Sequence, residues 1–255
     1  MTTTELITCA MEIGDMLLEN GAEIYRVEES MYRICKAYGA EDPEIFAVPT
    51  TIIITVKGKP GEAPITLTKR IYSRGTNLYK VDLLNALSRE MCATLPTYEA
   101  VNKRIETIKH FPSYSLFKQV LGFSFIAFFF TLLFKGTLQD ASCAFIIGAL
   151  LKLVLYTLGR IETNAFFENV ITGAITALVA LFFVKSGFAQ SMDKIIIGTI
   201  MSLVPGLAIT NSMRDIIAGD LLAGITKATE ALLIGAGIAV GAAIPLTFLQ
   251  PFLGV

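Results

Sequence analysis

The sequence has little of what catalytic and metal-binding sites require. Histidine occurs once in 255 residues, at His110, so we expect no histidine-based metal site within one chain. The phosphate-binding patterns GxxxxGKS and GxxxxGKT are absent, which argues against ATP-driven pumping by this chain. The patterns HExxH, GxSxG and GxGxxG are absent as well. These absences give no support to an enzyme of a familiar class, and we expect neither a metal nor a cofactor.

Cysteine spacing, net charge and the first residues exclude further classes. The cysteines show no CxxC spacing, so we expect reduced thiols that act as small apolar side chains; they are Cys9, Cys35, Cys92 and Cys143. The formal net charge of −1 gives no indication of nucleic-acid binding. The opening MTTTELITCAMEIGDMLLEN lacks a charged segment followed by an apolar one, so we expect no signal peptide.

Apolar residues dominate the second half of the chain. Hydrophobic residues make up 53% of the sequence and charged residues 17%, with a mean hydropathy of +0.61, which is too apolar for an ordinary soluble protein. Residues 1–118 carry 14 of the 21 Lys and Arg residues and 15 of the 22 Asp and Glu residues. This distribution predicts a polar N-terminal domain, residues 1–114, and a transmembrane domain, residues 115–255.

The N-terminal domain has the patterns of an α+β fold. Apolar spacing predicts helices over 4–19, 22–38, 78–93 and 97–110. The β-branched segment 44–56, the turn-forming residues 57–64 and the segment 65–73 predict a β-hairpin with a long loop. Asn20-Gly21, Pro96 and Pro112 mark the helix boundaries.

The transmembrane domain divides into five apolar segments: 117–134, 138–158, 164–184, 194–211 and 228–249. Each is close to the roughly 20 residues that an α-helix needs to cross a bilayer. A basic cluster precedes the first segment and predicts a cytoplasmic N-terminal domain; it consists of Lys103, Arg104, Lys109 and Lys118. The predicted fold is an α-helical polytopic membrane protein with about five transmembrane helices and an N-terminal cytosolic α+β domain.

The fourth apolar segment contains a helix breaker, and polar residues follow it. Pro205-Gly206 predicts either a broken helix at a transport site or a kink required only for packing. The residues that follow are Asn211, Arg214, Asp215 and Asp220. Because residues 212–226 are too polar to face lipid and too apolar for a free loop, they predict a loop, an interfacial helix or a re-entrant segment packed in protein.

One lysine lies inside the second apolar segment. Lys152 is surrounded by the sequence CAFIIGALLKLVLYTL, and a charge at membrane depth costs a few kcal/mol on insertion scales. We favour snorkelling towards the membrane surface. The alternatives are a pair with Glu162, Glu168 or Glu230, or a contact with a substrate.

Two stretches of the N-terminal domain also contain charged residues that could form a binding site or a salt-bridged surface. Arg70 and Arg74, with the amides of the following helix, predict either an anion site or only a hairpin exit with a helix cap. The sequence GAEIYRVEESMYRI places Glu23, Arg26 and Glu28 on a helix, which by itself is typical of a salt-bridged surface.

Taken in order, these stretches resemble the threonine/serine exporter family, specifically the large subunit of its two-component form. The resemblance rests on Gly21-Ala22-Glu23 with Arg26, Val27 and Glu28, on Arg70, Arg74-Gly75, Asn77 and Val81, and on Val204-Pro205-Gly206 with Asp215, Asp220 and Gly224. It implies a bacterial inner-membrane exporter of threonine/serine-type amino acids or of small dicarboxylates such as succinate. It also implies a small membrane partner subunit of the same family.

Three hypotheses follow. In the first, the chain is a proton-driven secondary exporter. Its substrate or proton pathway would be formed by Pro205, Gly206, Asn211, Arg214, Asp215, Asp220 and Lys152. Asp215 or Asp220 would accept a proton or a substrate ammonium, and Arg214 or Lys152 would bind a carboxylate. The cytosolic domain would gate the pathway or sense substrate through Glu28, Arg70, Arg74, Gly75 and Asn77.

In the second, the chain is a scaffold or regulatory subunit whose cytosolic domain binds a regulator. The third, a membrane-embedded enzyme, has only scattered carboxylates in its support. In all three we expect membrane lipid around the apolar helices and an oligomeric assembly.

Overall fold

The computed structural model describes residues 1–57, 63–112, 114–161 and 163–253. The chain forms two compact units. The first contains Met1–Pro112 and also Ala208–Ala228, and the second contains the rest of the chain. The first unit therefore includes a segment that the sequence analysis placed in the transmembrane domain. Each unit is described by itself.

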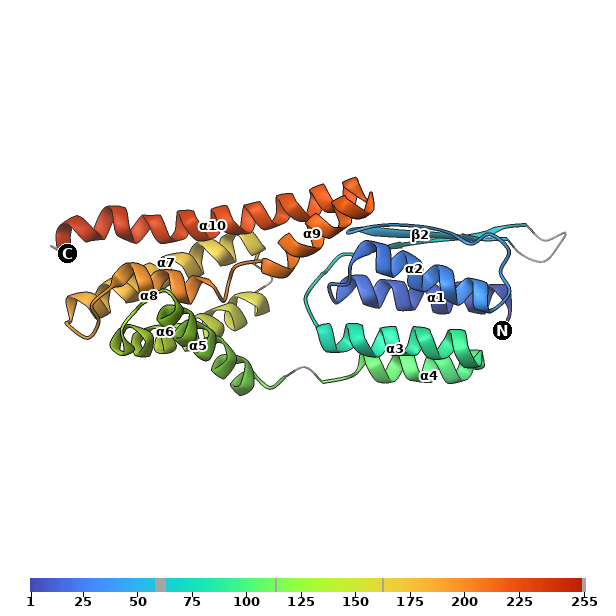
Figure 1. Ribbon diagram of the computed structural model, residues 1–255, viewed down its shortest axis with the longest axis horizontal. Coiled ribbons are helices and arrows are strands. Elements are labelled where there is room, and N and C mark those ends of the chain that lie inside the picture. The colour runs from blue at the N-terminus through green and yellow to red at the C-terminus, as the bar shows by residue number, and fades with distance from the viewer. Residues whose placement is uncertain (58–62, 113, 162, 254–255) are drawn as a thin grey trace. The chain divides into compact units, whose positions relative to one another are not determined.

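The first unit combines helices with a small antiparallel sheet (Figure 1). Its helices are α1 (Thr3–Glu19), α2 (Ile24–Ala37), α3 (Leu78–Thr94) and α4 (Tyr98–Lys109), and its strands are β1 (Glu44–Val48), β2 (Thr51–Val56) and β3 (Ile65–Arg70). The four helices confirm the sequence prediction within three residues at each end. The sheet has the order β1-β2-β3, and α1 and α2 pack against it.

The sheet differs from the predicted hairpin, because the segment 44–56 forms two strands rather than one. Val48 pairs with Thr51, so the chain reverses at Pro49-Thr50. Proline cannot donate a ladder hydrogen bond, which explains why an apparently continuous β-branched run is interrupted there. The third strand continues the meander with Ile52 opposite Lys69. Residues 58–62 of the predicted long loop lie outside the described part of the chain.

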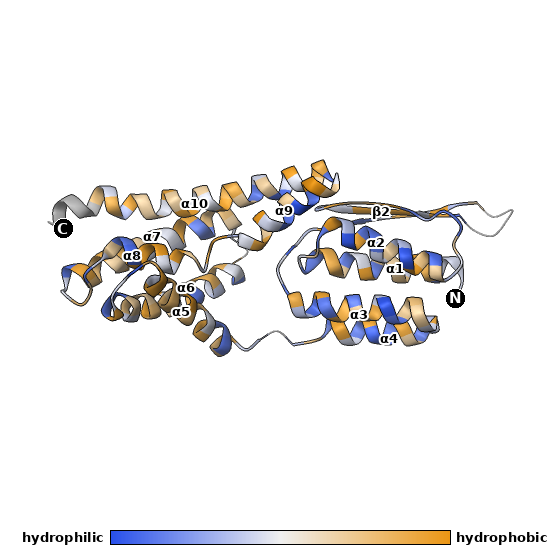
Figure 2. Ribbon diagram, viewed as in Figure 1, coloured by the Kyte–Doolittle hydropathy of each residue, from blue (hydrophilic) through white to orange (hydrophobic). Residues whose placement is uncertain are grey.

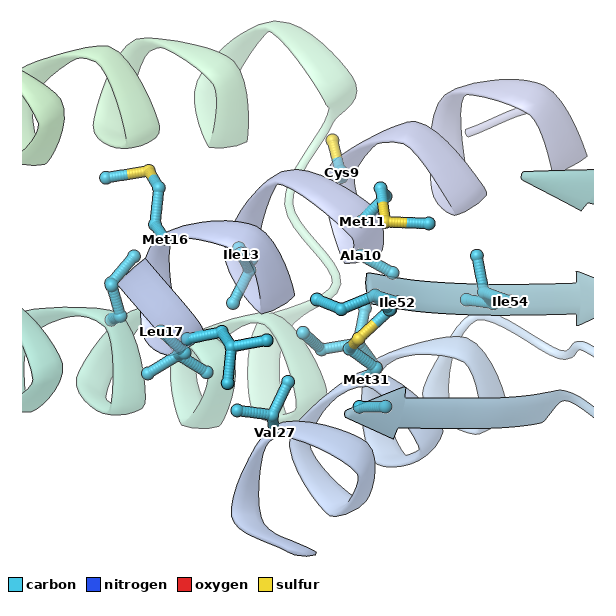
Figure 3. Close-up of a cluster of buried hydrophobic side chains, with 14 of the residues drawn as sticks. Cys9, Ala10, Met11, Ile13, Met16, Leu17, Val27, Met31, Ile52 and Ile54 are labelled. Carbon is cyan, nitrogen blue, oxygen red and sulfur yellow. The ribbon is translucent and has the colours of Figure 1, made fainter. Parts of the chain in front are cut away.

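The core of the first unit lies between α1, α2 and the inner face of the sheet. Ile13 and Leu17 of α1, Met31 of α2 and Ile52 of β2 are completely buried and lie in one cluster (Figure 3). Burying such a side chain stabilises a fold by about 1.5–3 kcal/mol relative to leaving it in water. Alternate residues of β2 are buried, because successive side chains of a strand point to opposite faces.

The cysteines behave as the sequence analysis predicted. All four are free thiols in the structure. Burial raises the pKa of both Cys9 and Cys35 to about 12. These two side chains are therefore protonated at neutral pH and fill space in the core as small apolar groups.

The junction between α1 and α2 brings distant segments together. Gly21 has φ of +91°, a backbone conformation that favours glycine, and a Cβ there would lie 3.0 Å from the carbonyl oxygen of Gly75. The amide of Gly75 donates to the carbonyl of Glu19 at 2.8 Å, and that of Asn77 to Asn20 at 3.0 Å. The loop after β3 is thereby fixed beside the end of α1.

The second unit is built from apolar helices. They are α5 (Leu116–Leu133), α6 (Leu138–Arg160), α7 (Ala165–Lys185), α8 (Met192–Ile200) and the part of α10 (Leu221–Leu253) that follows Thr229. Within the described residues, four helices are long and apolar enough to cross a membrane: α5, α6, α7 and residues Leu221–Phe248 of α10. Figure 2 shows mainly hydrophobic colours along α5 and α6, whereas α3 and α4 alternate between hydrophobic and hydrophilic residues.

The fourth apolar segment of the sequence, 194–211, is not one helix. Helix α8 ends at Ile200, and α9 (Gly206–Ala218) begins directly after Pro205. Proline disfavours helical conformation in the residue before it and offers no amide hydrogen bond, so the break follows from its position. The helix is interrupted at Pro205-Gly206, as the sequence indicated, and the expected fourth span is replaced by two shorter helices. A transport role for this break stays a prediction.

Small residues allow the helices of the second unit to approach closely. A Cβ at Gly148 of α6 would lie 2.7 Å from the carbonyl oxygen of Phe123 in α5, and one at Gly173 of α7 would lie 2.6 Å from that of Ile238 in α10. Close backbone contact at small residues is typical of helices that associate within lipid, where burial of apolar surface gives no driving force.

Candidate functional site

Asn211, Arg214 and Asp215 lie on α9, and Asp220 lies between α9 and α10. From residue 208 onward they belong to the same compact unit as the N-terminal helices. The side-chain amide of Asn211 donates to the carbonyl of Gly21 at 3.3 Å. Arg214 forms an ion pair with Glu23 at the start of α2. At the beginning of α10, Ala223 is 2% exposed and belongs to the core cluster of this unit. Residues 212–226 therefore form two helices joined by a turn at Gly219-Asp220, and one side of these helices packs on protein.

Glu23 joins two arginines from different helices. One carboxylate oxygen contacts Arg214 of α9, and the other lies 3.2 Å from Nε of Arg26 on α2. The Glu23 side chain is only 12% exposed, whereas both arginines are about half exposed, at 46% and 48%. This carboxylate neutralises part of both positive charges and connects α9 to α2.

A buried ion pair joins α9 to α10. The ammonium of Lys227 lies 2.8 Å from Oδ2 of Asp215, and the two side chains are 11% and 0% exposed. The chain reverses between the helices at Gly219, whose φ is +102°. A Cβ at Gly224 would lie 2.9 Å from the carbonyl oxygen of Ser212, so the two helices touch and place Lys227 opposite Asp215.

The second oxygen of Asp215 has no partner. Oδ1 is buried and accepts no hydrogen bond from the described part of the chain. Buried polar atoms are almost always paired, because an unpaired one costs about 1–3 kcal/mol. A buried, half-satisfied carboxylate is therefore a position at which a proton or another cation would be bound favourably.

Two further carboxylates act electrostatically on this pair. Burial raises the pKa of Glu28 and the negative charges of Asp220 and Asp215 raise it further, against a hydrogen bond from the amide of Ala47 that lowers it. Burial also raises the pKa of Asp220, as does the charge of Asp215, while Lys227 opposes the change. We call Glu28, Asp215 and Asp220, with Lys227, the carboxylate cluster. Three acidic groups and one ammonium leave an excess of negative charge.

The raised pKa values predict how stability depends on pH. Glu28 and Asp220 bind protons more tightly in the folded than in the unfolded chain, so they stabilise the fold as pH falls from about 7 towards their ordinary values near 4.5 and 3.8. Below those values both states are protonated and the gain is complete. In Glu28→Gln and Asp220→Asn the increase of the melting temperature on acidification should be smaller than in the wild-type chain. A thermal unfolding series in detergent measures it, and equal pH profiles in all three proteins would contradict the interpretation.

Glu28 also lines a cavity of about 450 Å³. Its walls include three carboxylates, those of Glu28, Glu29 and Glu44, and the rings of Tyr25 and Tyr32. Acidic groups beside aromatic faces suit a cation, because both attract positive charge. This cavity gives solvent access to one member of the carboxylate cluster.

The other residues predicted for the cytosolic domain have mainly local contacts. The side chain of Asn77 accepts the amide of Lys80 at 3.1 Å and caps α3, as the helix-cap alternative predicts. Gly75 lies against Gly21, the residue that Asn211 also contacts. The guanidinium of Arg70 lies 5.5 Å from the ring centroid of Tyr72, and Arg74 is exposed. The predicted anion site at these two arginines stays a prediction.

Lys152 belongs to the second unit. Its ammonium lies 5.1 Å from the ring centroid of Phe123 on α5, a distance at which a cation–π interaction is favourable. Among the described residues no carboxylate lies within ion-pair distance of it; Glu162 lies outside them. The snorkelling and substrate roles of Lys152 remain predictions.

Two important residues were missed by the sequence analysis. Lys227 received no role there; the only available signal was Gly219, which marks a turn between the two helices that carry Asp215 and Lys227. Asp140 received no role, although it is completely buried and accepts hydrogen bonds from the amides of Thr137, Gln190 and Ser191. Its position three residues after Thr137 is a capping-box signal that was available in the sequence.

Comparison with known proteins agrees with the family suggested by the sequence. The model of the family described as putative threonine/serine exporter matches residues 8–249. The probable threonine/serine exporter of Mycobacterium tuberculosis is 24% identical over 249 residues, which are 96% of this chain and 46% of that protein. The threonine/serine exporter of Corynebacterium glutamicum is 26% identical over 242 residues, 92% of this chain and 50% of that protein.

A second group of relatives has a similar length. The probable succinate transporter subunit YjjP of Klebsiella aerogenes is 26% identical over 248 residues, which cover 94% of this chain and 91% of that protein. The chain thus spans about half the length of the two exporters and nearly all of the subunit. No solved structure matches it. Together with the four apolar helices, these matches indicate a multi-pass membrane protein of a transporter family. The chain belongs to the putative threonine/serine exporter family.

Proposed function

We propose that this chain is one subunit of a proton-driven secondary exporter of small polar metabolites, either threonine/serine-type amino acids or small dicarboxylates. The two substrate classes are those in the names of its relatives. We further propose that it lies in the bacterial inner membrane with its N-terminal domain in the cytoplasm, as the basic residues before α5 predict.

The carboxylate cluster is the observation that carries this proposal. A proton-driven exporter needs a group that gains and loses a proton in the accessible pH range and is connected to an element that moves. Burial and mutual repulsion raise the pKa values of Glu28 and Asp220. Asp215 presents an unpaired buried oxygen beside them. Because the excess charge is negative, the cluster favours a proton or the ammonium group of an amino acid.

The position of the cluster in the chain supports a role in transport. Lys227 lies within the apolar segment Leu221–Phe248 of α10, so the helix that holds the buried ion pair is itself a candidate span. Asp215 lies on α9, directly after the break at Pro205. Protonation of the cluster would weaken the attraction between α9 and α10 and thereby change the packing of two helices joined to the membrane part. Discontinuous helices near binding sites are a recurring feature of secondary transporters.

Arg214 has a different role in this proposal from the one the sequence suggested. Because Glu23 already neutralises it, Arg214 holds α9 to α2 and is not assigned to a substrate carboxylate. Lys152 remains the candidate for that contact.

We also propose a small membrane partner subunit. Two relatives are about twice as long as the matched region, while a relative of matching length is named a subunit. A separate chain that supplies the remaining half would account for both observations.

Efflux from cells tests the proposed function. Exporter-deficient cells that express this chain, the partner or both are loaded with threonine, serine and succinate, and the medium is followed by mass spectrometry. We expect efflux of one solute class only when both chains are present. Confirmed membrane insertion of both chains without efflux of any of the three solutes would contradict the proposal and favour a scaffold role.

A further inference from the structure

A second cavity, of about 350 Å³, lies between α2 and α3. Helix α2 lines it with Arg26, Ser30 and Arg33, which recur at helical spacing on one face. Helix α3 lines it with Asn85, Ser88 and Arg89, which also share a face. Six side chains that donate hydrogen bonds therefore converge on one space.

Four of these side chains have no partner in the fold. Ser30, Asn85, Ser88 and Arg89 make no side-chain hydrogen bond or ion pair with any residue in the described ranges, and Ser88 is only 6% exposed. Ser30 and Asn85 are half-buried and Arg89 is exposed, so these groups are not fully shielded from water. Because no residue of the described fold uses these donors, they are free to bind acceptor oxygens of a ligand in the cavity.

The charge of the cavity defines that ligand. Three guanidinium groups face one carboxylate, that of Glu29, which lies 2.6 Å from Arg33. The lining is therefore positive overall, in contrast to the acidic cavity that contains Glu28 and Glu44 and shares Tyr25 and Glu29 with it. Planar guanidinium groups bind carboxylate and phosphate oxygens in pairs, and hydroxyl and amide groups complete such sites. We propose that this cavity binds a small oxyanion with two negative charges, a dicarboxylate or a phosphate, as a regulatory ligand.

The cavity is connected to the carboxylate cluster by one carboxylate. Glu23 contacts both Arg26, which lines the cavity, and Arg214, which precedes Asp215 on α9. An anion bound to Arg26 competes with Glu23 for that guanidinium and leaves Glu23 to Arg214. The bound anion thus strengthens the connection between α2 and α9. By thermodynamic reciprocity, the Glu23–Arg214 contact must strengthen anion binding.

Binding to the full-length chain in detergent tests the site independently of transport. Isothermal titration calorimetry with succinate and with inorganic phosphate shows which oxyanion is bound. Arg89→Gln should weaken binding by about tenfold, as expected for the loss of a charge-assisted hydrogen bond. Because Arg89 has no partner in the described fold, this change should leave the melting temperature unaltered. Arg104→Gln removes another exposed arginine charge, on α4, where Arg104 pairs with Glu90, and should leave the affinity unchanged.

Two results separate this site from the proposed transport site. Asp220→Asn should alter efflux but not the affinity for the anion, whereas Arg89→Gln should alter the affinity. Arg214→Gln, which lies outside the cavity, should weaken anion binding about threefold through Glu23. Absence of binding by both probes, or equal affinity in wild type and Arg89→Gln, would overturn the anion site. Equal affinity in wild type and Arg214→Gln would overturn its connection to α9.

Discussion

Lys227→Met is expected to lower the free energy of unfolding by about 3–5 kcal/mol, because it leaves a buried carboxylate without its partner. Asp215 is completely buried and already has one unpaired oxygen, so loss of the ammonium removes the contact at 2.8 Å that compensates its charge. No other ion pair among the described residues joins two side chains that are both almost inaccessible to solvent. We expect a correspondingly large fall in the yield of folded protein.

A second substitution distinguishes the ion pair from simple packing. Asp215→Leu combined with Lys227→Met replaces both charges by apolar side chains and should recover most of the lost stability, since apolar replacements of buried pairs are often neutral. Denaturant unfolding in detergent, followed by circular dichroism, measures all variants. A double variant as unstable as Lys227→Met would show that the lysine acts through packing and not through Asp215.

Asp140→Ala should destabilise the second unit by several kcal/mol. Oδ1 accepts the amides of Gln190 and Ser191 at 2.7 and 3.0 Å, and Oδ2 accepts the amide and hydroxyl of Thr137 at 2.9 and 2.8 Å. Alanine would leave these groups unpaired, at about 1–3 kcal/mol for each that stays buried, and would remove the N-terminal cap of α6. The loop between α7 and α8 would then be held to α6 only by weaker contacts, those of Gln190 with Gln139 and of Cys143 with Phe188.

Asn at the same position is the matched control. Asp140→Asn keeps one acceptor oxygen in place and should lose less stability than Asp140→Ala. Hydrogen exchange at Gln190 and Ser191 reports the loss locally. Unchanged protection of these amides in Asp140→Ala would show that water or another group satisfies them.

The sequence predicted best those elements whose signals are local. The helices of the first unit and the apolar helices α5, α6 and α7 agree closely with the expected ranges, because periodic apolar residues and flanking Gly or Pro define them. The break at Pro205 was predicted for the same reason. The turn at Pro49-Thr50 was missed, since β-branched residues on both sides concealed a strand boundary that the proline marks.

The arrangement of the candidate site could not be predicted from local patterns. Asn211 and Gly21 are 190 residues apart in the chain, and nothing in either segment indicates their contact. The sequence identified Glu28, Asp215 and Asp220 separately and assigned Glu28 to a different role from the other two. Glu28 interacts electrostatically with Asp215 and Asp220 only because α9 packs on the N-terminal helices. The role of Arg214 could not be predicted from the sequence either, because its ion pair with Glu23 depends on the fold.

The most direct test of the account is efflux from cells that carry Asp220→Asn together with the partner subunit. Asp220 is partly exposed, so its loss should preserve the fold while removing a proton-binding carboxylate from the cluster. Asp42→Asn is the control, because Asp42 is 71% exposed and its ion pairs among the described residues are with the surface lysines Lys36 and Lys57. The account predicts that Asp220→Asn reduces efflux at least tenfold, which corresponds to about 1.4 kcal/mol of activation free energy, with normal amounts in the membrane. Wild-type efflux, with an unchanged dependence on external pH, would contradict the central claim that the carboxylate cluster binds the coupling cation.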